Sequence, residues 1–246
     1  MNVLVIQNNP QTPAASVGDH LVAAGARLTA VLPHDGDALP KSPEDYDAAI
    51  ILGGPQHAHD DANFPAFPAI VDLLRGFHEE SKPLLGLCLG SQLLARAFGE
   101  KVRRSHAFEV GYPTIEITED GQKDPLLAGL APRQNILQWH EDTFDMPKGA
   151  VQLMTGSTIR NQAFRFGRTS YAFQCHFEVS PELAKQWFGQ WGHTIVRRYE
   201  EPTGRQVLAR AQGEIAQHGQ GAADFCRVVS QRWAGLVQDA RKGRAA

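Results

Sequence analysis

The sequence predicts an α/β protein with a doubly wound, mostly parallel sheet and helices on both faces of that sheet. Two observations support this prediction. Short segments that are almost wholly apolar alternate with helical patterns through the first hundred residues, as parallel strands buried on both faces do. Two of these segments end in glycine-rich turns, at residues 53–55 and 86–90. Both turns are expected at the carboxyl edge of the sheet, where proteins of this class bind ligands.

The individual elements follow from local patterns. Apolar residues at positions 70, 71, 73 and 74 share one helix face, and Gly25 ends a helix that begins near residue 14. Later segments alternate apolar and polar side chains, which predicts strands at residues 114–118 and 172–177 and, less cleanly, at 135–139. Pro181 follows Ser180, a favoured N-cap residue, so a helix should begin there. In the first hundred residues we expect strands at 3–6, 28–32, 48–52 and 84–87 and helices at 14–24, 67–77 and 91–98.

We expect the chain to have two parts, residues 1–200 as the sheet domain and residues 201–246 as a C-terminal helical extension. One face of a helix in the extension is apolar, and it should pack on the main domain; a homodimer contact is the alternative. The residues of this face are Phe225, Val228, Val229, Trp233, Leu236 and Val237. The extension is long enough for one or two helices and too short for a second catalytic domain.

Composition limits the classes of function. The 246 residues are 42% hydrophobic and 21% charged, as in an ordinary soluble globular protein. A net charge of −3 gives no reason to expect nucleic acid, and the apolar stretches are too short for a membrane span. The first residues resemble a strand rather than a signal peptide, and the three cysteines lie far apart, so a cytoplasmic location is expected. Without a phosphate-binding motif of the Gly-x-x-x-x-Gly-Lys-Ser/Thr kind, no cofactor is expected.

Cys88 is the leading candidate for a nucleophile. It lies between Gly86 and Gly90, where an apolar strand changes into a helical pattern. Glycines allow a turn tight enough to present the side chain at the end of the strand. The N-terminus of the following helix would direct free N–H groups and a positive dipole end toward the sulfur, which favours the thiolate form. A buried structural cysteine is the alternative interpretation.

A thiolate nucleophile usually needs a base and a group that orients the base. His176 and Glu178 are two residues apart, so in an extended chain both side chains would face one site while Cys175 and Phe177 face the core. The carboxylate would fix the tautomer of the imidazole and stabilise its cation. Attack on a carbonyl also needs N–H donors where negative charge develops, and the amides of Gly54 and Leu89 are the candidates.

Two other histidine segments are rivals. His140, with Glu141 and Asp142, forms a second histidine–carboxylate pair and an alternative base. The segment at residues 57–61, His-Ala-His-Asp-Asp, has the donor types of a metal site. It has the composition of a polar loop, with no further histidine or aspartate cluster at a ligand spacing, so we expect no metal.

Together these blocks resemble the class I, triad-type glutamine amidotransferases. The resemblance covers residues 1–200 and is closest to the glutaminase domain of GMP synthase and its stand-alone relatives. Three blocks match in order: residues 51–55 (Ile-Leu-Gly-Gly-Pro), 86–92 (Gly-Leu-Cys-Leu-Gly-Ser-Gln) and 174–178 (Gln-Cys-His-Phe-Glu). Residues 109–112 and 139–142 resemble two lesser signatures of the family. The resemblance implies the flavodoxin-like fold of these proteins.

The resemblance also implies roles for single residues. Cys88, His176 and Glu178 would form a catalytic triad, and the amides of Gly54 and Leu89 would form the oxyanion hole. Two positions depart from the family pattern. Phe177 replaces the proline of the usual His-Pro-Glu block, which should leave the chemistry intact, and Glu141 replaces a glycine at the rim, which puts substrate selectivity in doubt. The substrate site would include Gly53, Gln92, His140, Glu141 and Asp142.

The implied reaction removes the side-chain amide of glutamine through a γ-glutamyl thioester and gives glutamate and ammonia. Because residues 201–246 cannot form a synthase domain, the ammonia would pass to a separate synthase partner. A stand-alone hydrolase of γ-glutamyl amides or peptides is the alternative. A binding or regulatory protein without turnover is the third hypothesis, and the intact Cys, His and Glu set argues against it.

Overall fold

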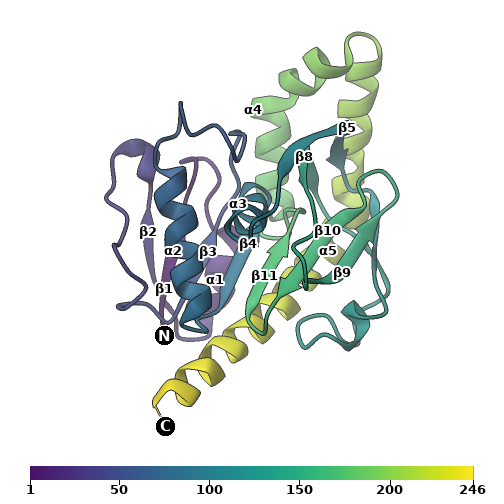
Figure 1. The fold of residues 1–246 in the computed structure, drawn as a ribbon. Helices are drawn as coiled ribbons and strands as arrows, with labels where there is room; N and C mark the ends of the chain where they lie inside the picture. Colours follow the sequence, from purple (N-terminus) through teal and green to yellow (C-terminus); the bar gives the residue numbers. More distant parts are fainter. Residues whose placement is uncertain (246) are drawn as a thin grey trace.

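The fold is a mixed nine-stranded sheet, described for residues 1–245 of a computed structural model. Strands β2, β1, β3, β4 and β11 are parallel neighbours in that order, and the strands beyond β11 run antiparallel to their neighbours. Two further strands, β5 (Val102–Gly111) and β8 (Gln138–Phe144), form a separate antiparallel ribbon (Figure 1). In sheet order the strands are β2 (Arg27–Val31), β1 (Asn2–Ile6), β3 (Ala48–Ile51), β4 (Leu84–Leu87), β11 (Ser170–Phe173), β10 (Asn161–Phe166), β9 (Val151–Gly156), β6 (Thr114–Ile117) and β7 (Arg133–Asn135).

Helices cover both faces of the sheet. Strand β1 divides its apolar side chains between two cores, with Val3 and Val5 on one face and Leu4 and Ile6 on the other. Helices α1 (Ala15–Ala23) and α5 (Thr203–Ala245) cover the first face, and α2 (Phe67–Glu79) and α3 (Leu89–Ala97) cover the second. This arrangement confirms the predicted doubly wound α/β class. Short 3-10 helices lie at Pro33–Asp35 and Gly121–Lys123.

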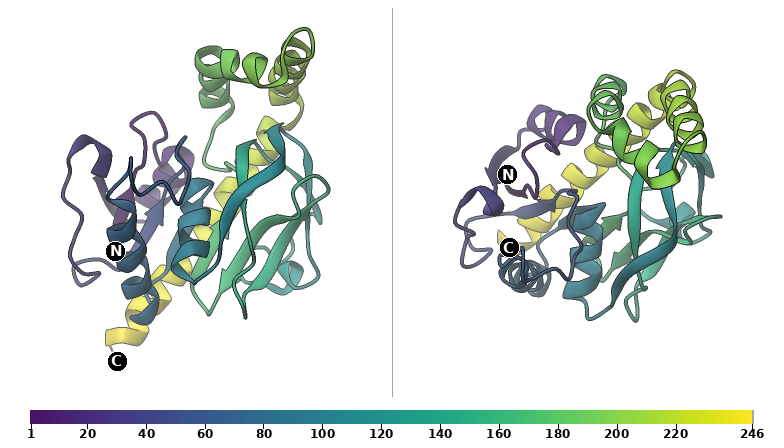
Figure 2. Two further views of the ribbon diagram at one scale, coloured as in Figure 1. Left: turned by 45° about the horizontal axis from the view of Figure 1, so that its top comes forward. Right: turned by 90° about the horizontal axis from the view of Figure 1, so that it is seen from above.

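Helix α4 (Pro181–Tyr199) begins where the sequence predicts, because the Ser180 hydroxyl accepts a hydrogen bond of 3.2 Å from the amide of Leu183. It stands with the first turns of α5 above the sheet, and α5 then runs diagonally behind the strands to the C-terminal end (Figures 1 and 2). Phe225, Val229 and Trp233 of α5 are buried in the core with α1 and the sheet. The domain boundary at residue 200 stays a prediction.

The antiparallel half of the sheet departs from the predicted elements. Residues 135–139, expected as one strand, divide between β7 and β8. The strand expected at residues 172–177 ends at Phe173, so His176 and Glu178 lie in the turn that follows β11. It ends there because the chain leaves the sheet, and the amide of His176 donates to the carbonyl of Leu137, 2.8 Å away.

Within residues 1–245, no helix combines the length and the apolar character needed to cross a bilayer.

Candidate active site at the carboxyl edge of the sheet

Cys88 occupies a strained turn between β4 and α3. Its backbone has φ of 51° and ψ of −110°, a conformation that side-chain-bearing residues rarely adopt. Glycines make the turn sterically feasible. A Cβ atom on Gly90 would overlap the carbonyl oxygen of Ile51, and one on Gly86 would overlap the carbonyl oxygen of Gly90. The predicted strand–turn–helix is therefore confirmed, and it places the Cys88 side chain at the carboxyl edge of the sheet.

His176 and Glu178 form a buried hydrogen-bonded pair. Nδ1 of His176 lies 2.7 Å from Oε1 of Glu178, and the two residues are 4% and 1% exposed. The imidazole also converges on Cys88. A Cβ atom on Gly53 would lie 2.9 Å from Cε1 of His176 and 3.5 Å from Cβ of Cys88, so only glycine leaves room for both side chains. Cys175 and Phe177 are buried in the core on the other side, as the sequence predicts.

The pKa of His176 lies well above its usual range. Burial alone would lower this pKa, but the Glu178 carboxylate and the side chain of Cys88 outweigh it by charge and by hydrogen bonding. The other two cysteines are kept neutral in the core. Burial raises the pKa of the Cys175 thiol well above its usual range and that of the Cys226 thiol to about 12. Cys88, by contrast, lines the cavity and lies beside the imidazole of His176.

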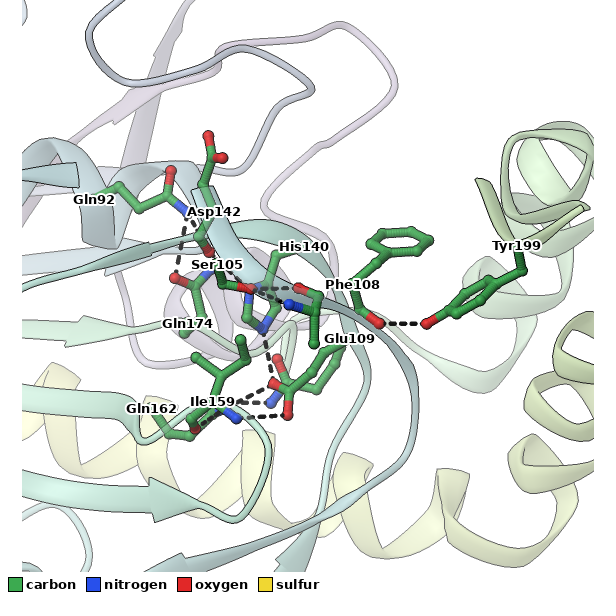
Figure 3. Close-up of polar contacts among 12 residues, drawn as sticks. Gln92, Ser105, Phe108, Glu109, His140, Asp142, Ile159, Gln162, Gln174 and Tyr199 are labelled. Carbon is green, nitrogen blue, oxygen red and sulfur yellow. Dashed lines mark hydrogen bonds and ion pairs between the residues drawn. The ribbon is translucent and has the colours of Figure 1, made fainter. Parts of the chain in front are cut away.

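His140 has both ring nitrogens engaged, which makes it unsuitable as a general base. Nδ1 lies 2.9 Å from the carbonyl oxygen of Asp142, and Nε2 lies 3.0 Å from Oε2 of Glu109 (Figure 3). A carbonyl only accepts, so Nδ1 must donate, and the contact with Glu109 then needs a second shared proton. Gln162 and the amide of Ile159 also donate to Glu109, so this carboxylate is held in place beside the His140 ring.

The rim of the site is built from the other predicted residues. Gln92 is 3% exposed, and its Nε2 lies 3.3 Å from both the carbonyl of Asp142 and Oε1 of Gln174 (Figure 3). The Glu141 carboxylate pairs with Arg198 of α4 at 2.9 Å. Burial raises the pKa of Asp142, while the charge of nearby His57 opposes that shift.

The segment at residues 57–61 does not gather into a metal site. Asp61 forms a two-pronged ion pair with Arg96, in which Nη2 of Arg96 lies 2.7 Å from Oδ2. Nε2 of His59 lies 3.3 Å from the amide of Val102, and Nε2 of His57 lies 3.7 Å from Oδ2 of Asp142. Across residues 1–245, no three His, Cys, Asp or Glu side chains are grouped to hold a metal ion.

A cavity of about 680 Å³ joins these residues. Cys88 and His176 line it together with Gly54 and Gln92, and β3 lies parallel to β4, so the turns after both strands open into it. Leu89 is the first residue of α3, so its amide has no partner within the helix. Another part of the lining comes from β8 and α4 and is strongly aromatic, with Trp139, Trp187 and Trp191.

Comparisons with known proteins identify the family of this chain. The family model described as glutamine amidotransferase class-I matches residues 6–190. The chain belongs to the class-I glutamine amidotransferase family. A crystal structure of a glutamine amidotransferase from Methylobacillus flagellatus superimposes with a TM-score of 0.83 at 25% identity, covering 94% of this chain and 93% of that one. The resemblance noted in the sequence is therefore confirmed at the level of family and fold.

Two curated relatives are similar over different shares of their own length. The glutamine amidotransferase-like protein YfeJ of Salmonella typhimurium is 31% identical over 61% of this chain and 64% of its own length, so this chain spans less than two thirds of that relative. One subunit of the glutamine-hydrolysing GMP synthase of Sulfolobus acidocaldarius is 28% identical over 76% of this chain and 97% of its own length.

Three residues of the candidate site carry no clear signal in the sequence. In the sequence, Glu109 belongs only to a lesser signature. In the structure, its carboxylate contacts the ring of His140, which lies 31 residues further along the chain. Trp187 and Trp191 belong to a helical pattern that gives them no role, although their spacing of four residues puts them on the same helix face. Their position in the same cavity as Cys88 depends on the fold and cannot be predicted from the helical pattern.

Proposed function

We propose that this amidotransferase hydrolyses the γ-carboxamide of a glutamyl substrate through a thioester on Cys88. The observation that carries the proposal is the convergence of Cys88 with the buried His176–Glu178 pair at a cavity on the carboxyl edge of the sheet. A strained turn holds the sulfur, and a carboxylate orients the imidazole. This is the arrangement that nucleophilic catalysis by cysteine requires.

The reaction follows from this geometry. The Cys88 thiolate attacks the amide carbon, and a tetrahedral oxyanion forms. The C–N bond then breaks as His176 gives its proton to the leaving nitrogen, which departs as ammonia or an amine. Water next attacks the thioester carbon and gives a proton to His176, and the thiolate leaves with glutamate as the second product. Glu178 orients the imidazole and stabilises the imidazolium in both half-reactions.

The amides of Gly54 and Leu89 are the proposed oxyanion hole. Leu89 offers a free amide at the start of α3, and the positive end of that helix is closest to the developing charge. Gly54 packs against Leu89, because a Cβ atom there would lie 3.2 Å from Cδ2 of Leu89. Gly53 and Gln92, with residues 140–142, would hold the glutamyl part of the substrate.

Glutamine is the first proposed substrate, with its ammonia delivered to a separate synthase partner. The similarity to the GMP synthase subunit of Sulfolobus acidocaldarius supports this assignment. A γ-glutamyl amide hydrolase that works alone is the second candidate, and one observation favours it. The cavity of 680 Å³ is in the range of about 300–1,000 Å³ that holds drug-sized ligands, which are larger than glutamine.

The test is to incubate the purified chain with glutamine and with γ-glutamyl peptides and to measure the glutamate released. Hydroxylamine added to the reaction should trap the thioester as γ-glutamyl hydroxamate. Glutamate from glutamine alone supports the first substrate, and preferential cleavage of peptides supports the second. The thioester mechanism would be ruled out if glutamate formed without any hydroxamate and if a thiol-alkylating reagent did not reduce turnover.

The two buried histidines should differ sharply in their importance. His176→Ala should lower kcat/KM by at least about 10³-fold, because it removes the group that carries the proton. His140→Ala should lower it by about tenfold, mainly through KM, because His140 shapes the rim and has no free ring nitrogen. Circular dichroism would verify folding of both variants. The opposite ranking would make His140 the base.

Glu178→Gln should move the alkaline limb of the pH profile of kcat/KM to lower pH. The carboxylate favours the imidazolium and contributes to the raised pKa of His176. Without it this pKa falls, so His176 loses its catalytic proton at a lower pH. The measurement is kcat/KM against pH for the wild type, for Glu178→Gln and for Glu182→Gln. Glu182 is exposed on α4, so its variant should keep the wild-type limb. An unchanged limb in Glu178→Gln would exclude Glu178 as the partner of the base.

A further inference from the structure

An aromatic surface begins at the reacting residues and extends along the cavity. The ring of Trp187 meets that of His176 edge to face, with centroids 5.3 Å apart and planes at 87°. Trp191 lies 5.3 Å from Trp187 and 6.2 Å from Trp139 by the same measure. All three indole side chains line the cavity. We call Trp139, Trp187 and Trp191 the tryptophan wall.

Packing does not bury the whole surface of the tryptophan wall. Trp187 is only 4% exposed, but Trp139 and Trp191 keep part of their surface open to the cavity. Contiguous apolar surface left in contact with water is a feature of binding sites rather than of ordinary protein surface. The wall is therefore available to an apolar part of a ligand.

The wall lies beside the residue that must reach the leaving nitrogen. His176 must reach the leaving nitrogen to give it a proton, and Trp187 packs directly on His176. The proposed site for the glutamyl end includes Gln92 and Asp142, where Nε2 of Gln92 donates to the carbonyl of Asp142. A substituent on the leaving nitrogen would therefore extend along Trp187 and Trp191.

Helix α4 is held over the cavity by contacts at its C-terminal end. The hydroxyl of Tyr199 donates to the carbonyl of Phe108 at 2.6 Å (Figure 3). Arg198 pairs with Glu141, and Gly192 packs so closely on α5 that a Cβ atom would lie 2.9 Å from a Leu208 methyl carbon. A surface fixed before the ligand arrives loses little entropy on binding.

We propose that the tryptophan wall binds the leaving group, and that this group is an amine that carries an aromatic ring, such as an aromatic amino acid joined through its α-nitrogen to the γ-carbonyl of glutamate. The inference rests on the proposed function and narrows its second candidate to a substrate class. Cleavage gives glutamate and the free amine with its aromatic ring, with water supplying the hydroxyl and the proton.

The experiment compares γ-glutamylphenylalanine with γ-glutamylalanine, which differ by one phenyl ring. The wild-type kcat/KM should be at least about tenfold higher for the phenylalanine peptide, as expected when an aromatic ring is buried against other rings. Trp191→Ala should reduce this ratio by at least about threefold, and Trp191→Phe should retain most of it. Gln190→Ala, on the exposed face of the same helix, should keep the wild-type ratio.

A second readout does not depend on turnover. Both peptides are titrated into the Cys88→Ser protein while tryptophan fluorescence is followed, and the phenylalanine peptide should bind at least about tenfold more tightly. If the protein cleaves glutamine but cleaves and binds the two peptides equally well, the inference is overturned and the proposed function stands. Cleavage of neither glutamine nor either peptide would overturn both.

Discussion

Cys88→Ser should lower the turnover of any γ-glutamyl substrate by at least about 10³-fold while the fold stays intact. A serine hydroxyl keeps nearly the same volume, so the strained turn between β4 and α3 should still form. It is not ionised at neutral pH, however, and the imidazole of His176 would then face a weak nucleophile. Removing one member of a catalytic unit costs most of the rate that the unit supplies.

Cys226→Ser is the matched control for this experiment. Cys226 is buried in α5 within the core, and its sulfur lies 3.7 Å from the hydroxyl of Ser230. Its raised pKa keeps it a neutral thiol, so the variant should retain wild-type kcat in its folded fraction. Glutamate release, corrected for the folded fraction by circular dichroism, is the measurement. Activity of Cys88→Ser within tenfold of the wild type would remove Cys88 from the mechanism.

Gly90→Ala should destabilise the protein by about 3 kcal/mol or more, at the upper end of the cost of overpacking a core. The added methyl group would overlap the carbonyl oxygen of Ile51, which is backbone and cannot rotate away. Relief requires α3 to move off β3, and that movement would also displace Cys88. The free energy of unfolding from urea titration should fall, and the remaining folded protein should lose activity.

Gly213→Ala provides the control for the glycine experiment. Gly213 lies on the exposed side of α5, and nothing would lie within 4 Å of a Cβ atom there. The same substitution should therefore raise helix stability by about 0.5–1 kcal/mol. If the two variants unfold at the same urea concentration, the close approach of α3 to β3 is not a constraint on this fold.

The parallel half of the molecule could be predicted closely from the sequence, and the reason is local. Strands β1, β3 and β4 are short, almost wholly apolar and bounded by turn residues, so periodicity and length are enough to place them. Cys88 could be placed for the same reason, because two glycines on either side of it permit few other turns. The sequence predicts that His176 lies beside Glu178, as observed, but it places both residues in a strand. They lie in a turn, which can bring residues i and i+2 together as a strand can.

The antiparallel half could not be predicted with the same accuracy. Strand β5 mixes exposed and buried residues without alternation, because its register with β8 shifts between Arg104 and Glu109. The role of Glu109 depends on that pairing, and so does its contact with Gln162, 53 residues away. The tryptophan wall likewise needs α4 to be placed against β8. Contacts of this range leave no periodic signal in one sequence.

The length and position of α5 have a consequence for biosynthesis. Helix α5, which shares the cover of one face of the sheet with α1, is translated after every strand of that sheet has been made. Until Trp233 and Val237 have left the ribosome, the apolar side chains that α5 covers on that face remain open to water or to a chaperone. Nascent chains that stall before this point should therefore be captured by chaperones or aggregate, even though the residues of the Cys88 turn have already been translated.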